Sequence, residues 1–165
     1  RPQPTIALET LAALTTQDGG HLTPADLKAQ PFAVLFGYTH CPDVCPTTLL
    51  DWSNVLDGLA QEARGFKVLF VSVDPERDTP EALKGYMRSF NPGITALTGS
   101  PAQIAAAAAQ FDAAYARNDG ENGQYSYDHS VKSYLVGVDR YLFATLDLNS
   151  EAAVRRDLVQ RLRTE

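Results

Sequence analysis

The sequence predicts an α/β fold with a central mixed sheet flanked by helices, and three observations support it. Residues 32–38 and 66–73 are nearly all apolar, as is typical of strands buried on both faces of a parallel sheet. A helical pattern of apolar residues follows each of them. Near the end, residues 133–138 and 141–146 form two strand-like segments joined by a tight turn, which adds antiparallel strands.

The elements before and around the first buried strand follow from local patterns. Residues 5–10 are a short strand-like lead, and residues 15–22, with an Asp-Gly-Gly turn at their centre, predict a β-hairpin. Thr23 and Pro24 then begin a short helix, since proline is favoured at the first helical position. After the buried strand, residues 42–63 carry apolar side chains at helical spacing.

The elements after the second buried strand are predicted in the same way. A helix begins at Thr79, and a short strand covers residues 94–97. Ser100 opens an Ala-rich helix with the capping box S-P-A-Q. Residues 117–130 are polar and show no period, so we expect a long loop there. A last helix is expected over residues 151–162.

Parallel βαβ units followed by an antiparallel hairpin and a last helix make a thioredoxin-like fold, here with an N-terminal β-hairpin extension. A chain of 165 residues is expected to form one such domain, residues 1–165. The net charge of −6, with no basic stripe, argues against a nucleic-acid partner. No apolar run approaches the ~18 residues of a membrane span.

The two cysteines, Cys41 and Cys45, carry the most specific chemical signal. They form a C-x-x-x-C motif where the first buried strand meets its helix, unlike the C-x-x-C of disulfide oxidoreductases. Near a helix start, thiols at i and i+4 share one face and lie close to the positive end of the helix dipole, which favours thiolates. Such a pair indicates a soft-metal site, a redox pair, or both; inert core cysteines are the structural alternative.

A third ligand would come from a histidine or from the single methionine, Met87. His129 is the best candidate, because it ends the long polar loop, and long loops in compact domains are usually functional. Two thiolates and an imidazole suit Cu(I) and also accept Cu(II). The alternative is a hydrogen-bonded structural histidine. We expect His21 to be solvated and Met87 to pack in the core or on a helix surface, and no fourth ligand for zinc is evident.

Four further residues are candidates for supporting this site. Asp128 neighbours His129 and could orient its imidazole, although adjacent side chains of an extended segment point apart. His40 is either a fourth ligand or an exposed neighbour of the first cysteine. Asp74 and Asp78 follow the second buried strand at the carboxyl edge of the sheet, where they could add negative charge to a cation site or a partner surface. Their alternative role is an acidic helix start.

Three motifs of the chain resemble the SCO/SenC family. They are G-Y-T-H-C-P-D-V-C-P-T-T-L at residues 37–49, S-V-D-P-E-R-D-T-P at residues 72–80 and Y-D-H-S at residues 127–130. The resemblance implies a thioredoxin-like copper protein that helps to assemble the copper centre of cytochrome c oxidase, with Cys41, Cys45 and His129 as copper ligands. It also implies a place in the bacterial periplasm, with the mitochondrial intermembrane space as the alternative.

The leading hypothesis is a copper metallochaperone that delivers Cu(I) or Cu(II) to the dinuclear centre of cytochrome c oxidase or matures that centre. The implied partners are the copper-binding subunit of the oxidase and a second copper chaperone, and a segment before Arg1 would supply a membrane anchor. The alternative is an enzyme, a thiol–disulfide reductase whose redox pair Cys41 and Cys45 keeps the oxidase cysteines reduced. A third hypothesis is a peroxide-reducing or redox-sensing relative of the peroxiredoxins, which would need a readily formed sulfenic acid.

Overall fold

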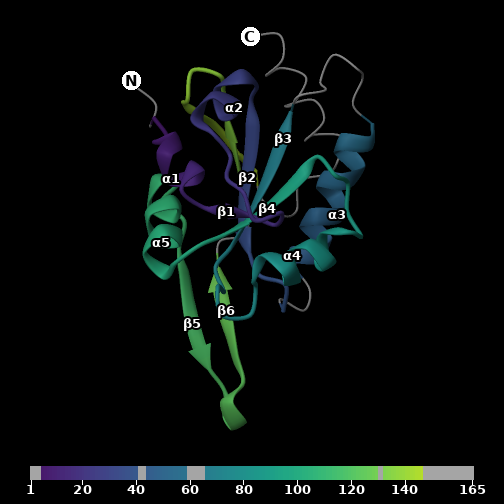
Figure 1. Ribbon diagram of the computed structural model, residues 1–165, viewed down its shortest axis with the longest axis vertical. Coiled ribbons are helices and arrows are strands. Elements are labelled where there is room, and N and C mark those ends of the chain that lie inside the picture. The colour runs from purple at the N-terminus through teal and green to yellow at the C-terminus, as the bar shows by residue number, and fades with distance from the viewer. Residues whose placement is uncertain (1–4, 41–43, 59–65, 130–131, 147–165) are drawn as a thin grey trace.

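The structure is a computed structural model that describes residues 5–40, 44–58, 66–129 and 132–146 (Figure 1). Its centre is a six-stranded mixed sheet with the strand order β1-β4-β3-β2-β7-β8. These strands are β1 (Thr15–Thr16), β2 (Phe32–Gly37), β3 (Lys67–Ser72), β4 (Ile94–Thr98), β7 (Ser133–Val136) and β8 (Leu142–Leu146). A second, two-stranded sheet consists of β5 (Tyr115–Asp119) and β6 (Tyr125–His129), with the 3-10 turn η2 (Glu121–Gly123) between them. The helices are α1 (Leu8–Ala12), α2 (Pro24–Ala29), α3 (Val44–Asp57), α4 (Pro80–Met87) and α5 (Pro101–Gln110).

The middle of the large sheet is parallel. β3 pairs in parallel with β2 on one side and with β4 on the other. The antiparallel strands β1, β7 and β8 complete the two flanks. This arrangement confirms the predicted mixed sheet, and it places the carboxyl ends of β2 and β3 side by side, with Gly37 opposite Ser72.

Alternate side chains of β2 enter two cores, one on each face of the sheet. Phe32, Val34 and Phe36 belong to a buried cluster that includes apolar side chains of α1 and α5. Ala33 and Leu35 belong to a second cluster, which includes apolar side chains of α3 and α4. Figure 1 shows the same division, with α1 and α5 on one side of the sheet and α3 and α4 on the other. Helices on both faces explain why every residue of β2 is buried.

Three helices begin at the caps that the sequence indicates. The side chains of Thr23, Thr79 and Ser100 each accept a hydrogen bond from a backbone N–H in the first turn, and a proline follows each of them. Ser100 also forms the predicted capping box with Gln103. These local signals were sufficient because capping is satisfied within four neighbouring residues.

The predicted N-terminal β-hairpin is wrong. Thr15 and Thr16 pair with β4 instead, opposite Thr98 and Leu97. The tight turn does form, with the Gly19 N–H donating to the carbonyl of Thr16, but the described residues that follow it are not a strand. The open edge of β4 offers the short strand a buried partner, which the exposed residues after the turn do not. The strand-like lead over residues 5–10 is likewise wrong in its second half, which belongs to helix α1, while Thr5 forms an isolated antiparallel bridge with Tyr141.

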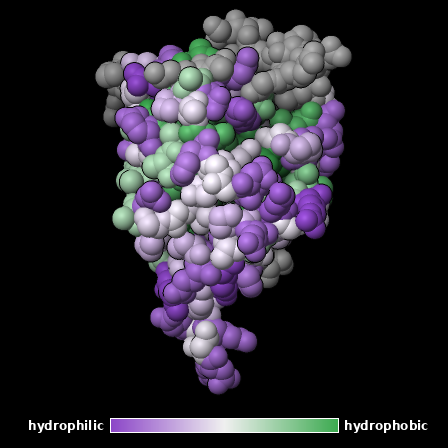
Figure 2. All heavy atoms as spheres, viewed as in Figure 1, coloured by the Kyte–Doolittle hydropathy of each residue, from purple (hydrophilic) through white to green (hydrophobic). Residues whose placement is uncertain are grey.

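The long loop expected over residues 117–130 is also wrong, because most of it is a β-hairpin. β5 and β6 pair in antiparallel register from Tyr115 opposite His129 to Asp119 opposite Tyr125. Asn122 and Gly123 have φ angles of 59° and 77°, which the reversal of the chain requires. We call this hairpin, residues 115–129, the arm. It projects away from the large sheet, and the face of the arm that Figure 2 shows is largely hydrophilic.

The predicted closing helix over residues 151–162 lies outside the described residues. In the described parts of the chain, every helix is too short or too polar to cross a membrane.

Candidate metal centre

The C-x-x-x-C motif belongs to the connection between β2 and α3. Cys41 lies outside the described residues, and Cys45 is in the first turn of α3, where the backbone but not the side chain is described. β2 ends at Gly37, and Tyr38, Thr39 and the exposed His40 lead from it toward Cys41. The connection that contains the motif therefore leaves the carboxyl end of β2, where the sequence predicted it.

His129 lies beside the segment that leads into this motif. It is the last residue of β6, and its ring meets the ring of Tyr38 edge to face, with centroids 5.8 Å apart. The hydroxyl of Tyr38 accepts a hydrogen bond of 3.0 Å from the backbone N–H of Tyr127. The base of the arm is thus held at the end of β2, three residues before the first cysteine. The predicted third ligand is therefore close in space to Tyr38, in the segment that leads toward the predicted first ligand.

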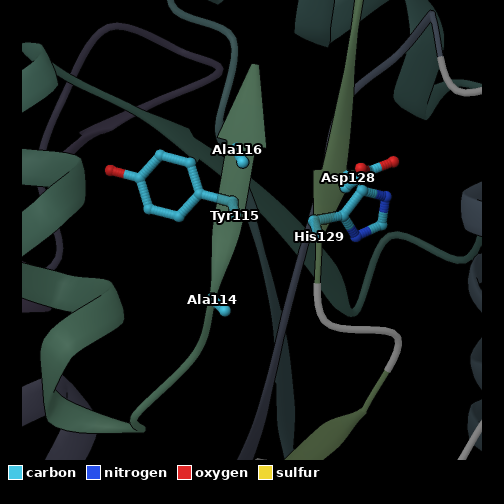
Figure 3. A pocket seen from close by; sticks show the side chains of 5 residues that line it. All are labelled: Ala114, Tyr115, Ala116, Asp128 and His129. Carbon is cyan, nitrogen blue, oxygen red and sulfur yellow. The ribbon is translucent and has the colours of Figure 1, made fainter. Parts of the chain in front are cut away.

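One side of the His129 imidazole borders a hollow in the surface of about 340 Å³. Its lining is mostly apolar, and Figure 3 shows the rings of Tyr115 and His129 pointing in opposite directions beside two small alanine side chains. The hollow is lined by Ala114, Tyr115, Ala116, Asp128 and His129. His129 is partly exposed.

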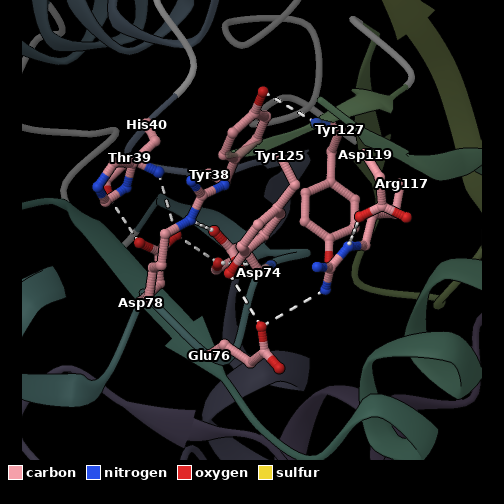
Figure 4. Close-up of polar contacts among 12 residues, drawn as sticks. Tyr38, Thr39, His40, Asp74, Glu76, Asp78, Arg117, Asp119, Tyr125 and Tyr127 are labelled. Carbon is pink, nitrogen blue, oxygen red and sulfur yellow. Dashed lines mark hydrogen bonds and ion pairs between the residues drawn. The ribbon is translucent and has the colours of Figure 1, made fainter. Parts of the chain in front are cut away.

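Asp78 fixes Thr39, in the segment that leads from β2 toward Cys41. Its carboxylate is fully buried and accepts hydrogen bonds from the backbone N–H of Thr39 at 3.0 Å and from the Thr39 hydroxyl at 2.5 Å. The hydroxyl of Ser72, the last residue of β3, donates to the same carboxylate at 2.6 Å. Asp78 thus joins the ends of β2 and β3 at the residue two positions before Cys41 (Figure 4).

Asp74 connects the loop after β3 to the arm. It is fully buried, and its carboxylate accepts hydrogen bonds from the guanidinium of Arg77 and from the hydroxyl of Tyr125 at 3.2 Å. The same hydroxyl lies 3.0 Å from the carboxylate of Glu76. The ring of Tyr125 lies between two guanidinium groups, those of Arg77 and Arg117, each 3.8 Å from its centroid. The sequence did not single out Arg77, Arg117 or Tyr125.

The surroundings keep Tyr125 neutral and Arg77 charged. Burial and the hydrogen bond to Glu76 raise the pKa of Tyr125 to about 12, because both disfavour the phenolate. Desolvation opposes the charge of Arg77, but the hydrogen bond and the charge of Asp74 outweigh it, so the pKa of Arg77 is raised. Tyr125 therefore remains a hydrogen-bond donor, and Arg77 remains a cation, throughout the range in which proteins normally work.

The ligand atoms of His40, Asp74 and Asp78 lie within 4.8 Å of one another, a spacing that a cation site would need. Both carboxylates already accept hydrogen bonds from protein groups, and Arg77 brings a positive charge into the cluster. His40 is exposed, with its Nδ1 3.2 Å from the hydroxyl of Thr39. These contacts favour the interpretation that the cluster is a hydrogen-bond network that holds the segment before Cys41, rather than a second metal site.

The remaining candidates take the places that the sequence favoured for them. Met87, the last residue of α4, is buried in the core, and His21 is exposed with its Nδ1 2.9 Å from the carbonyl of Leu14. Asp128 is among the exposed positions of β6, which alternate with the half-buried positions Tyr127 and His129. Because side chains alternate along a strand, Asp128 lies on the opposite face of β6 from His129.

Comparison with known proteins gives a family. The family model described as SCO1/SenC matches residues 7–164. The mitochondrial SCO1 homolog of Homo sapiens is 36% identical over 130 residues, which are 77% of this chain and 43% of that protein. The SCO2-like protein RP587 of Rickettsia prowazekii is 38% identical over 125 residues, 74% of this chain and 61% of that protein. The chain thus spans less than two thirds of the length of either relative.

Two solved structures of relatives with copper bound have the same architecture. That of ScoI from Bradyrhizobium japonicum has a TM-score of 0.83 and 37% identity, and covers 90% of this chain and 95% of that one. That of ScoI from Arabidopsis thaliana has a TM-score of 0.81 and 30% identity, and covers 92% of this chain and 96% of that one. The chain belongs to the SCO1/SenC family and has its thioredoxin-like fold.

Proposed function

We propose that this protein is a copper carrier that binds one copper ion through the thiolates of Cys41 and Cys45 and the imidazole of His129. The observation that carries the proposal is the contact between His129 and Tyr38, which lies three residues before Cys41. In this proposal, two segments far apart in the sequence would supply three ligand groups to one region. Thiolates are the preferred protein ligands of Cu(I), and imidazole adds affinity for Cu(II).

The surroundings of these residues fit a carried ion better than a permanently enclosed one. His129 is partly exposed, next to an open hollow, and His40 at the start of the motif is exposed. An acceptor can therefore replace the ligands of copper one at a time, with no electron transferred if the ion leaves in the oxidation state in which it arrived. Copper-bound relatives at 37% and 30% identity support copper as the cargo.

We further propose that the acceptor is the copper-binding subunit of cytochrome c oxidase, and that the protein works in the bacterial periplasm, held there by a membrane anchor. The three-motif resemblance to the SCO/SenC family supports this assignment, and a second copper chaperone would supply the ion. The test is transfer from the copper-loaded protein to the purified, reduced copper-binding domain of the oxidase, followed by separation of the two proteins. Copper that stays with the carrier would contradict this partner.

The metal site itself is tested by titrating the reduced protein with Cu(I) and with Cu(II). We expect one tightly bound copper per chain, and a loss of at least about tenfold in affinity in Cys41→Ser, Cys45→Ser and His129→Ala. The matched control is His21→Ala, which removes an exposed histidine outside the site and should bind like the parent. Unchanged affinity in His129→Ala would contradict the three-ligand site.

A second candidate function is disulfide reduction. The thioredoxin-like fold and the place of the motif at the end of the central parallel strand favour it. One thiolate of Cys41 or Cys45 would attack a target disulfide, and the other would then release the reduced target and close a Cys41–Cys45 disulfide. Incubation of the reduced protein with an oxidised oxidase peptide, followed by thiol counting, tests this. Recovery of the disulfide in the peptide, with both cysteines still reduced, would contradict it.

A further inference from the structure

The arm that carries His129 is not part of the large sheet. Among the described residues, β5 and β6 pair only with each other, and the arm projects from the body of the molecule (Figure 1). A two-stranded ribbon by itself is marginally stable in water. The direction of the arm, and with it the position of His129, therefore depends on side-chain contacts with the body.

One row of side chains on β6 makes these contacts. Tyr125, Tyr127 and His129 occupy alternate positions and are half-buried, whereas the residues between them are exposed. The rings of Tyr127 and His129 both lie edge to face against Tyr38, at 5.5 and 5.8 Å. Tyr125 contacts the ring of Tyr127 at 6.0 Å and begins the row, about 13 Å from His129 along the strand. Fixing Tyr125 thus fixes the direction of the strand that ends at His129.

Tyr125 is fixed on both ring faces and at its hydroxyl (Figure 4). The guanidinium of Arg77, from the loop after β3, covers one side, and that of Arg117, from β5, also stacks on the ring, each at 3.8 Å. The hydroxyl reaches the carboxylates of Asp74 and Glu76 in the same loop. These contacts join the arm to a loop that is itself well anchored.

Arg77 joins that loop to the start of the cysteine motif as well. Its Nε donates to the buried carboxylate of Asp74, and its guanidinium carbon lies 5.8 Å from the ring centroid of Tyr38. The next residue, Asp78, holds the backbone and hydroxyl of Thr39. One short loop, residues 74–78, therefore contacts both the arm with His129 and the segment that leads to Cys41.

We propose that Arg77 and Tyr125 are positioning residues of the copper site, which clamp the arm to the loop after β3 so that His129 stays beside Tyr38, in the segment that leads to Cys41. Neither residue is a copper ligand. The inference rests on the proposed function, because it concerns the imidazole that the function assigns to copper. It goes beyond the three ligands, since it assigns the placement of one of them to a cation and an aromatic ring outside the ligand set.

The test is a double-mutant cycle on Cu(II) affinity, with Tyr125→Leu placed in the native chain and in a His129→Ala chain. We expect Tyr125→Leu to weaken binding about tenfold in the native chain, as for loss of a residue that orients a ligand, and to have almost no effect without His129. Arg77→Met should behave in the same way, and the double variant Arg77→Met with Tyr125→Leu should be little worse than either single one.

Two controls separate positioning from damage to the fold. Tyr125→Phe keeps the ring between the two guanidinium groups and should recover most of the affinity. Tyr141→Leu changes an exposed tyrosine outside the arm and should bind like the parent. The thiolate-to-Cu(II) absorption band should change in Tyr125→Leu and be retained in both controls.

The outcomes distinguish this inference from the proposed function. An equal loss of Cu(II) affinity from Tyr125→Leu in both backgrounds, or no loss in the native chain, would overturn the positioning role. The assignment of His129 as a ligand would still stand, provided that His129→Ala weakens copper binding. Unchanged affinity in His129→Ala itself would overturn the ligand set, and the positioning role with it.

Discussion

The six-stranded sheet and the arm are stabilised by different kinds of contact. The sheet lies between two apolar clusters, and its central strand β2 is buried along its whole length. The arm is largely hydrophilic on the face that Figure 2 shows, and its inner face contacts the body through aromatic rings, guanidinium groups and buried carboxylates. Burial of apolar area is strong and non-directional, whereas stacking and hydrogen bonds are weaker but fix orientation. The sheet thus provides stability, and the arm contacts provide the placement of a ligand.

The largest effect on stability is expected in the body, at Trp52. Its side chain is fully buried, stacks on Phe66 and donates a hydrogen bond of 3.0 Å to the hydroxyl of Ser133. We expect Trp52→Ala to lower the free energy of unfolding by about 3–5 kcal/mol, measured by denaturant titration. Trp52→Phe, which keeps most of the volume, should cost less; a loss below about 1 kcal/mol in the alanine variant would contradict the importance of this contact.

A smaller but still clear effect on stability is expected at Asp78, which holds the segment that leads to Cys41. Asp78→Ala removes the acceptor of hydrogen bonds from the buried hydroxyl of Ser72 and from the partly buried backbone N–H and hydroxyl of Thr39. We expect a loss of about 2–3 kcal/mol in unfolding free energy, together with weaker copper binding. Exposed Asp18→Ala is the control and should change neither quantity appreciably. Native copper affinity in a folded Asp78→Ala protein would show that this segment is fixed by other contacts.

In the arm, the same kind of change should act locally. Arg117→Met removes one of the two cations on Tyr125 and two exposed ion pairs, so the global stability should change by less than about 1 kcal/mol. Hydrogen exchange of the Tyr127 N–H, which donates to Tyr38, should nevertheless become faster. If this amide exchanges only when the whole molecule unfolds, the arm and the body are one cooperative unit and the comparison fails.

The smallest effect is an alkaline one. The pKa of Tyr125 is raised from 10.0 to about 12, so the stabilisation that comes from its neutral hydroxyl is complete below pH 10 and is lost as the pH rises from 10 toward about 12. Near-ultraviolet titration of tyrosinate should show a late step that is missing in Tyr125→Phe. If the late step is also present in Tyr125→Phe, or is absent from both proteins, the contacts assigned to this hydroxyl are contradicted.

The body was predictable from the sequence because its signals are local and apolar. The runs that form β2 and β3 and the caps at Thr79 and Ser100 are all visible within a few residues. The N-terminal hairpin was predicted wrongly because Thr15 and Thr16 pair with β4, a partner distant in the sequence. Turn chemistry alone does not reveal which edge of a sheet is open.

The arm was missed because its strands are polar. The available signal was the alternation of Tyr125, Tyr127 and His129 with two small or charged residues, a period of two that an apolar search overlooks. The places of Asp74 and Asp78 near the cysteine motif followed from the order of parallel strands. The contact of Arg77 with Tyr125 could not be predicted, because it joins a loop and a strand whose distance depends on the whole fold.

The most direct test of the copper site is X-ray absorption spectroscopy of the reduced, copper-loaded protein beside its His129→Ala variant. The account predicts two sulfur ligands and one nitrogen ligand in the native protein, and loss of the nitrogen ligand in the variant. Copper bound by sulfur alone in the native protein, or an unchanged nitrogen ligand in the variant, would contradict the assignment of Cys41, Cys45 and His129 as the site.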